Sequence, residues 1–171
     1  MRRFGPGSGT GAGFASAFGR LELPISEREA MVGDPLSLLI TDDDRDFRES
    51  LRSLFEPRGF QTILAGDGEE ALVIVRRQPI HLLLVDMHMP RLSGLETIRR
   101  LKALDFRTPC ILMSAGLDER LESDARAAEA FGVLRKPFRA DVLTGVVRDA
   151  MRSCYNVVWP ADPAPAADPM G

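Results

Sequence analysis

The sequence predicts an α/β fold in which one open sheet of five parallel strands is covered by helices on both faces. Two observations support this prediction. Short apolar runs alternate five times with segments of helical period, which is the pattern of parallel strands joined by helices. The third run, residues 81–85, is apolar without alternation, as a strand covered on both faces requires. Because crossovers between parallel strands are right-handed, such a sheet has a crevice at the carboxyl ends of its strands.

The length of the chain suits one folded domain with flexible ends. With 171 residues, of which 44% are hydrophobic, it can bury one sizeable core but hardly two. We expect a flexible glycine-rich extension over residues 1–34, a folded domain over residues 35–153 and a tail rich in Pro and Ala over residues 154–171. Met31 is an alternative start of the chain. The apolar patch at residues 155–159 could either dock a partner or fold back on the domain.

The charge balance argues against two classes of partner. The chain has 22 basic and 25 acidic residues, a formal net charge of -3, which gives no electrostatic footprint for nucleic acid or an anionic membrane. No apolar stretch is long enough to span a bilayer, so we expect a cytoplasmic protein.

The two cysteines, Cys110 and Cys154, lack the spacing of metal ligands and are expected to be buried or idle thiols.

The first two strands are predicted at residues 36–41 and 61–65. A helix lies between them, because four apolar residues recur at helical spacing, namely Phe47, Leu51, Leu54 and Phe55. Gly59 closes this helix. After the second strand, Asp67 is expected to cap the next helix and Glu70 to complete a capping box.

The other three strands are predicted at residues 81–85, 110–113 and 133–135. The strand at residues 81–85 is expected to be central, and it stops abruptly at Asp86. The helix after it carries Leu95, Ile98 and Leu101 on one face. A helix rich in Ala and charge is predicted over roughly residues 118–130. The last helix carries Val142, Leu143, Val146, Val147 and Ala150.

Residues able to handle phosphate or metal follow every predicted strand except the second. They are Asp42, Asp43 and Asp44 after the first strand, Asp86 after the third, Ser114 after the fourth and Lys136 after the fifth. The carboxyl ends of parallel strands share one edge of a sheet, so we expect these side chains to converge. Carboxylates gathered there repel one another unless a cation lies among them. The set therefore predicts a Mg²⁺ site for phosphoryl transfer, to which Lys136 adds positive charge.

Asp86 is the residue best placed to act as the nucleophile. It ends the most hydrophobic strand, with acids on one side and with Ser114 and Lys136 on the other. A carboxylate can attack phosphorus and form an acyl phosphate, and cations and hydrogen-bond donors can neutralise the phosphoryl oxygens. Such chemistry requires no histidine or cysteine base. Asp44 is better explained as a helix cap than as a metal ligand.

Four segments carry a resemblance to a known family. They are residues 39–44, residues 83–90 with Gly94, residues 112–115 and residues 135–138. Over residues 35 to 152 the chain resembles the receiver domain of bacterial two-component response regulators. The resemblance implies a flavodoxin-like fold with strand order 2-1-3-4-5 and a single-domain protein similar to the chemotaxis regulators. It also implies a phosphoacceptor in signalling and not an enzyme.

The resemblance further implies a role for each residue of the site. The Mg²⁺ ligands would be Asp43, Asp86 and the backbone carbonyl of His88, with Asp42 acting mainly through water. Asp86 would accept the phosphoryl group, Lys136 would pair with one of its oxygens, and Ser114 would move to hydrogen-bond another. The Lys136–Pro137 peptide bond would be cis.

The partners implied by the resemblance are proteins. The donor would be a phosphohistidine on a sensor histidine kinase or phosphotransfer protein, and the target an unknown downstream protein. Hydroxyl movement would bias a two-state equilibrium in the face formed by the fourth predicted helix, the fifth strand and the fifth helix. We expect a monomer or a weak homodimer. The His88 side chain could tune hydrolysis of the acyl phosphate, although an exposed polar loop residue is the commoner outcome.

Two features depart from the family pattern. Family members carry an aromatic residue three positions before the lysine, where this chain has Val133. Phe131 could substitute for it if the strand extends that far, because alternate strand residues point to the same side; the simpler interpretation is that Phe131 is a core residue. The turn before Val133 lacks the family's small Gly-Ala pair, which suggests a shortened or reshaped fourth helix.

Two other functions fit parts of the pattern. The run from Asp42 to Asp44 also fits the Asp-x-Asp signature of haloacid-dehalogenase-type phosphohydrolases, in which the first aspartate is the nucleophile. In that family a threonine or valine commonly stands two positions after the second aspartate, but this chain has Asp46 there. An acidic pair also follows the lysine in that family, whereas only Asp141 follows Lys136 here.

The other alternative is a receiver-like binding module that is not phosphorylated. The complete set of carboxylates, hydroxyl and lysine argues against it.

Overall fold

The computed structural model describes residues 2–3 and 35–157. The expected folded domain lies within this part of the chain. The expected extension over residues 1–34 falls outside it apart from Arg2 and Arg3. The tail expected over residues 154–171 also falls outside it apart from residues 154–157, of which Cys154 and Tyr155 belong to the last helix.

The described strands form one sheet in the order β1-β6-β5-β4-β2-β3. The five long strands are β2 (Leu36–Thr41), β3 (Phe60–Ala65), β4 (Leu82–Asp86), β5 (Cys110–Ser114) and β6 (Gly132–Arg135). They are all parallel to one another and β4 is central, which confirms the predicted order 2-1-3-4-5. The sequence did not predict β1 (Arg2–Arg3), which pairs antiparallel with β6 at the edge of the sheet.

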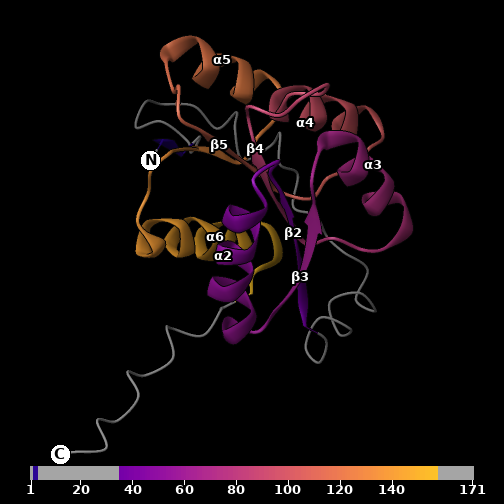
Figure 1. The fold of residues 1–171 in the computed structure, drawn as a ribbon, viewed down its shortest axis with the longest axis vertical. Helices are drawn as coiled ribbons and strands as arrows, with labels where there is room; N and C mark the ends of the chain where they lie inside the picture. Colours follow the sequence, from indigo (N-terminus) through magenta and orange to yellow (C-terminus); the bar gives the residue numbers. More distant parts are fainter. Residues whose placement is uncertain (1, 4–34, 158–171) are drawn as a thin grey trace, which may run out of the picture.

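Helices cover both faces of the sheet, as predicted (Figure 1). They are α2 (Arg45–Phe55), α3 (Gly68–Arg77), α4 (Gly94–Ala103), α5 (Glu119–Ala127) and α6 (Ala140–Tyr155), with a short 3-10 turn η1 (Glu56–Arg58) after α2. Alternate residues of each strand point to opposite faces. The domain therefore has two hydrophobic clusters, one between the sheet and α3, α4 and α5, the other between the sheet and α2 and α6.

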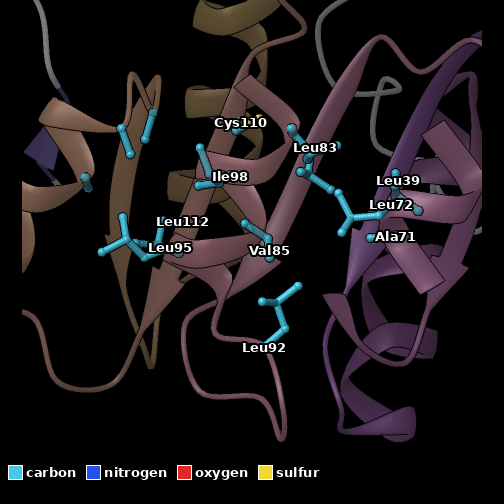
Figure 2. Packing of buried hydrophobic residues seen from close by; sticks show 14 of the residues in the cluster. Leu39, Ala71, Leu72, Leu83, Val85, Leu92, Leu95, Ile98, Cys110 and Leu112 are labelled. Carbon is cyan, nitrogen blue, oxygen red and sulfur yellow. The ribbon is translucent and has the colours of Figure 1, made fainter. Parts of the chain in front are cut away.

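The first of these clusters shows how the central strands are held. Figure 2 shows Leu83 and Val85 of β4 beside Leu112 of β5, with Ile98 and Leu95 of α4 packed over them. All five residues of β4 are buried. The apolar sequence of the first four residues of this strand is therefore explained by cover on both faces.

Carboxylates start two of the helices as predicted. Asp44 caps α2 by accepting hydrogen bonds from the backbone N–H groups of Asp46 and Phe47, and Asp67 caps α3 by accepting one from Glu70. The capping box was predicted wrongly in one detail. The Glu70 carboxylate accepts from the N–H of Gly66, 2.7 Å away, because the chain turns so that this N–H, and not that of Asp67, faces the helix.

The region between α5 and β6 decides between the two alternatives for Phe131: it is a core residue and not a substitute for an aromatic residue at position 133. Val133 belongs to the cluster under α3, α4 and α5, whereas Phe131 belongs to the cluster under α2 and α6. Phe131 therefore does not substitute for an aromatic residue at position 133. The reason is that β6 begins at Gly132, so the alternation of strand residues does not reach Phe131.

Helix α5 ends at Ala127, three residues before the predicted end, and Glu129 takes a left-handed conformation (φ 61°).

The end of α6 folds back on the domain. The Tyr155 hydroxyl donates a hydrogen bond to the His81 carbonyl at 2.8 Å, and the two rings meet edge to face with centroids 6.0 Å apart. The alternative in which Tyr155 docks a partner is thus not supported. The rest of the patch from residue 158 onwards lies outside the described residues.

Candidate functional site

The polar residues singled out in the sequence lie together at the carboxyl ends of four strands. Asp86 and Ser114 are the last residues of β4 and β5, and Asp42 and Lys136 directly follow β2 and β6. The strand register aligns these ends, because Thr41 pairs with Val85, Asp86 with Met113 and Ser114 with Arg135. Convergence at one edge of the sheet was predicted, and it follows from parallel strands held in register.

Three carboxylates form the acidic part of the site. Oxygen atoms of Asp42, Asp43 and Asp86 all lie within 4.8 Å of one another. Asp42 and Asp86 are buried at the strand ends, whereas Asp43 is exposed. Oxygen donors at this spacing suit a hard divalent cation such as Mg²⁺, and only Asp43 faces solvent directly.

Lys136 joins two of these carboxylates. Its ammonium nitrogen lies 2.7 Å from an oxygen of Asp42 and 3.0 Å from an oxygen of Asp86. The same nitrogen lies 4.1 Å from the ring centroid of Phe47. The Lys136–Pro137 peptide bond is cis, as the sequence resemblance implied.

Both carboxylate oxygens of Asp42 have partners. One oxygen accepts a hydrogen bond from the Asp44 N–H at 2.9 Å, and the other pairs with Lys136. The Asp42 backbone is also held, since its N–H donates to the Ala65 carbonyl and its carbonyl accepts from the Arg48 guanidinium. These contacts make Asp42 a fixed group that orients its neighbours.

The charges of the site shift the ionisation of its two central groups. Burial raises the pKa of Asp86, and the nearby charges of Asp42 and Asp43 raise it further, whereas the hydrogen bond from Lys136 opposes the shift. Burial tends to lower the pKa of Lys136, but the hydrogen bonds and charges of Asp42 and Asp86 outweigh burial, so the pKa is raised. The site therefore keeps a charged ammonium group beside a carboxylate that is costly to ionise. An added cation would relieve that cost.

Ser114 and His88 occupy the positions expected of them. Ser114 is fully buried, and its hydroxyl oxygen accepts a hydrogen bond from the Gly116 N–H at 3.2 Å. The Lys136 N–H donates to the Ser114 carbonyl at 2.9 Å, so the two residues are tied through the backbone. His88 is exposed on the loop after β4, which agrees with the simpler interpretation of its side chain. The role of its carbonyl as a metal ligand stays a prediction.

Two residues near the site were not predicted from the sequence. Phe47 was expected only to contribute to the core, but its ring contacts the Lys136 ammonium group. Phe138 packs edge to face against Phe47, with centroids 6.0 Å apart. An apolar residue in the first turn of a helix gives no signal for this role, because only the fold shows which strand end the turn faces. A hollow of about 270 Å³ opens beside these residues and is lined by Phe47, Ala115, Lys136, Pro137 and Phe138.

None of the helices in residues 35–157 is both long and apolar enough to cross a membrane.

Comparisons with known proteins agree with this geometry. The family model of the response regulator receiver domain matches residues 38–148. The chain is 36% identical over 119 residues to the response regulator MprA of Mycobacterium leprae (strain TN). This alignment covers 68% of this chain and 51% of that protein. It is 33% identical over 132 residues to MprA of Mycobacterium sp. (strain KMS). This alignment covers 76% of this chain and 56% of that protein. The chain thus spans about half the length of these relatives.

Solved structures share the fold of this chain. The receiver domain of the Francisella response regulator 1452 superposes with a TM-score of 0.65 at 28% identity and covers 70% of this chain and 99% of that one. The Borrelia burgdorferi structure described as a CheX-CheY-BeF3-Mg+2 complex gives a TM-score of 0.68 at 26% identity and covers 71% of this chain and 93% of that one.

Proposed function

The chain belongs to the response regulator receiver domain family, and from that premise we propose that it accepts a phosphoryl group on Asp86 in a Mg²⁺-dependent reaction. Phosphorylation by a kinase is the general mechanism of this family. The proposed donor is a phosphohistidine on a partner sensor histidine kinase or phosphotransfer protein. The observation that carries the proposal is the Lys136 ammonium group shared between Asp86 and Asp42 at the carboxyl ends of the sheet.

Asp86 is the proposed nucleophile. One of its oxygens pairs with Lys136, and the other attacks phosphorus. A P–O bond to Asp86 forms while the P–N bond of the donor phosphohistidine breaks, and the imidazole nitrogen leaves with the electron pair. Burial raises the pKa of Asp86, so the site must offset the cost of ionising this carboxylate before it can react.

The other residues would bind and orient the phosphoryl group. Lys136 would turn from Asp86 to one phosphoryl oxygen, and the Ser114 hydroxyl would hydrogen-bond another. The proposed Mg²⁺ ligands are Asp42, Asp43, Asp86 and the backbone carbonyl of His88, with Asp42 acting mainly through water. When bound there, Mg²⁺ supplies positive charge that neutralises the phosphoryl oxygens.

The phosphorylated domain would signal through protein contacts. We propose that residues 35–153 form the receiver unit of a single-domain, cytoplasmic regulator that works as a monomer or weak homodimer. Engagement of Ser114 and Lys136 would bias the face formed by α5, β6 and α6, because Ser114 is the last residue of β5 and Lys136 directly follows β6, which contacts α5. An unknown downstream protein would bind that face. The only chemistry of the regulator itself would be phosphotransfer to Asp86 and hydrolysis of the acyl phosphate.

Chemical phosphorylation tests the proposal without a cognate kinase. The purified protein is incubated with phosphoramidate and Mg²⁺, and the modified aspartate is identified by borohydride reduction and peptide mass spectrometry. We expect modification at Asp86, with none in Asp86→Asn or after chelation of Mg²⁺. Asp46→Asn is the control, because Asp46 is an exposed acid in the first turn of α2. Failure of the wild-type protein to be modified or to bind beryllofluoride would leave the unphosphorylated binding module as the better account.

The hydrolase alternative predicts a different modified residue. It requires phosphorylation of Asp42, whose two carboxylate oxygens are already bound to Asp44 and Lys136. This arrangement favours Asp86 as the nucleophile. Modification of Asp42, or turnover of small phosphate esters, would reverse the assignment.

A further inference from the structure

Three side chains of two kinds surround the Lys136 ammonium group. Two are the carboxylates of Asp42 and Asp86, and the third is the ring face of Phe47. A cation at 4.1 Å from a ring centroid is attracted by the negative face of the ring. Since the lysine is a flexible side chain and only partly buried (23% exposed), the ring restricts the positions that the ammonium group can adopt.

The Phe47 ring is itself held in place from both ends. Its backbone N–H donates to the Asp44 carboxylate, which caps α2 directly after the acidic residues of the site. The ring also packs edge to face against Phe138, two residues after Lys136. The segment that carries Asp42 and Asp43 and the segment that carries Lys136 therefore meet at this ring.

An aromatic ring suits this position better than another polar group. A further carboxylate beside Lys136 would add negative charge that repels the incoming phosphoryl group. The ring attracts the ammonium group without accepting a directed hydrogen bond, so the N–H donors stay available for carboxylate or phosphoryl oxygens. An aliphatic side chain would fill the space but would provide no such attraction.

We propose that Phe47 is a positioning residue that holds the Lys136 ammonium group at the site while its partner changes from Asp86 to the phosphoryl group. This inference rests on the function proposed for Asp86. It predicts that the ring acts only through Lys136 and that its electron density matters as well as its volume.

The first experiment measures the contact itself. The chain has two lysines, Lys102 and Lys136, so lysine labelled with ¹³C at the ε position gives two NMR signals. Protons above an aromatic ring are shifted upfield, and we expect this shift for Lys136 but not for Lys102. Phe47→Leu should abolish the shift. A wild-type Lys136 signal that coincides with that of Lys102 would overturn the proposal.

The second experiment measures the rate of Asp86 phosphorylation by phosphoramidate in the full chain. We expect Phe47→Leu to slow the reaction about three- to tenfold, and Phe47→Tyr and Phe47→Trp to retain most of the rate. Mono-, di- and trifluorinated phenylalanine at position 47 should slow it progressively, since fluorine withdraws density from the ring face but hardly changes its shape. Phe106→Leu is the matched control, because Phe106 packs against the other cluster. Equal rates across the fluorinated series would overturn the proposal.

A double-mutant cycle with Lys136→Ala tests whether the ring acts through the lysine. In that background Phe47→Leu should cause no further loss of rate, whereas an equal fractional loss would assign Phe47 a purely structural role and overturn the proposal. The cycle also separates two kinds of failure. If wild-type Asp86 is not phosphorylated, the proposed function fails and the positioning role with it. If it is phosphorylated normally and Phe47→Leu has no effect, only the positioning role fails.

Discussion

Gly94 lies so close to the backbone of Asp86 that no side chain fits between them. A Cβ atom built at position 94 would overlap the Asp86 carbonyl oxygen and would also press on Leu112. The Gly94 N–H donates to the Met87 carbonyl at 3.0 Å, which fixes this approach. The first turn of α4 is thereby locked to the end of the strand that carries the proposed phosphoacceptor.

Gly94→Ala should therefore destabilise the domain. The added methyl group meets backbone atoms, which cannot rotate away, so we expect the free energy of unfolding to fall by about 2 kcal/mol. Urea unfolding followed by circular dichroism measures the change. Gly145→Ala in α6 is the matched control: no atom lies within 4 Å of its added Cβ, and a helical Gly→Ala change stabilises by about 0.5–1 kcal/mol. Equal stability of Gly94→Ala and wild type would contradict the close approach.

Magnesium should stabilise the folded domain through the three carboxylates. A ligand that binds only the folded state adds about 2.7 kcal/mol to the free energy of unfolding at about one hundred times its Kd. We expect a Mg²⁺-dependent rise in unfolding temperature for the wild-type protein and a much smaller rise for Asp43→Asn. Asp105→Asn should behave like the wild type, since Asp105 is exposed and pairs with Arg107. A full Mg²⁺ effect in Asp43→Asn would remove Asp43 from the metal ligands.

The raised pKa of Asp86 predicts a pH-dependent cost of folding. Above an ordinary aspartate pKa of about 3.9, the unfolded chain loses this proton while the folded chain retains it. Stability therefore falls as pH rises to the folded pKa, and the cost is fully present above it. Asp86→Asn should be more stable than the wild type at neutral pH without Mg²⁺, and the difference should vanish below about pH 4. A variant less stable than the wild type at neutral pH would show that the Lys136 pair outweighs burial.

His81 predicts a loss of stability on mild acidification. Its Nδ1 accepts a hydrogen bond from the Ser37 N–H at 2.8 Å, and burial lowers its pKa. As pH falls below about 6.5, the unfolded chain takes up a proton that the folded chain does not, so stability falls until the lowered folded pKa is reached. His81→Asn keeps an acceptor near Nδ1 but cannot titrate.

Denaturant unfolding at several pH values measures the effect. The slope of stability against pH should become smaller in His81→Asn. It should persist in His88→Asn, because His88 is exposed on a loop. An unchanged slope in His81→Asn would assign the pH dependence to other groups.

Much of the fold and the candidate site was predictable from local sequence patterns together with one rule of topology. That rule is that the carboxyl ends of parallel strands lie at the same edge of a sheet. The apolar runs predicted five strands, and the parallel arrangement placed Asp42, Asp86, Ser114 and Lys136 at one edge. Helix caps such as Asp44 and Asp67 were also predictable, since a cap satisfies N–H groups only a few residues away.

The features that were missed depend on contacts between distant segments. The Phe47 ring lies over Lys136 only because the first turn of α2 and the turn after β6 meet, and helical spacing does not reveal that contact. The core position of Phe131 was the simpler prediction and is confirmed, but the alternative stayed open because alternation is a weak guide at the start of a strand such as β6. A two-residue strand such as Arg2–Arg3 has no periodicity at all.

The salt bridges of Lys136 also bear on how the protein is made. A ribosome synthesises Asp42 and Asp86 long before Lys136, although the lysine is the cation that bridges both carboxylates. A nascent or truncated chain that stops before β6 carries the buried acids without their counter-charge, which disfavours the native strand ends. Under the proposed function, competence to react at Asp86 would thus be acquired only when nearly the whole domain has emerged and closed.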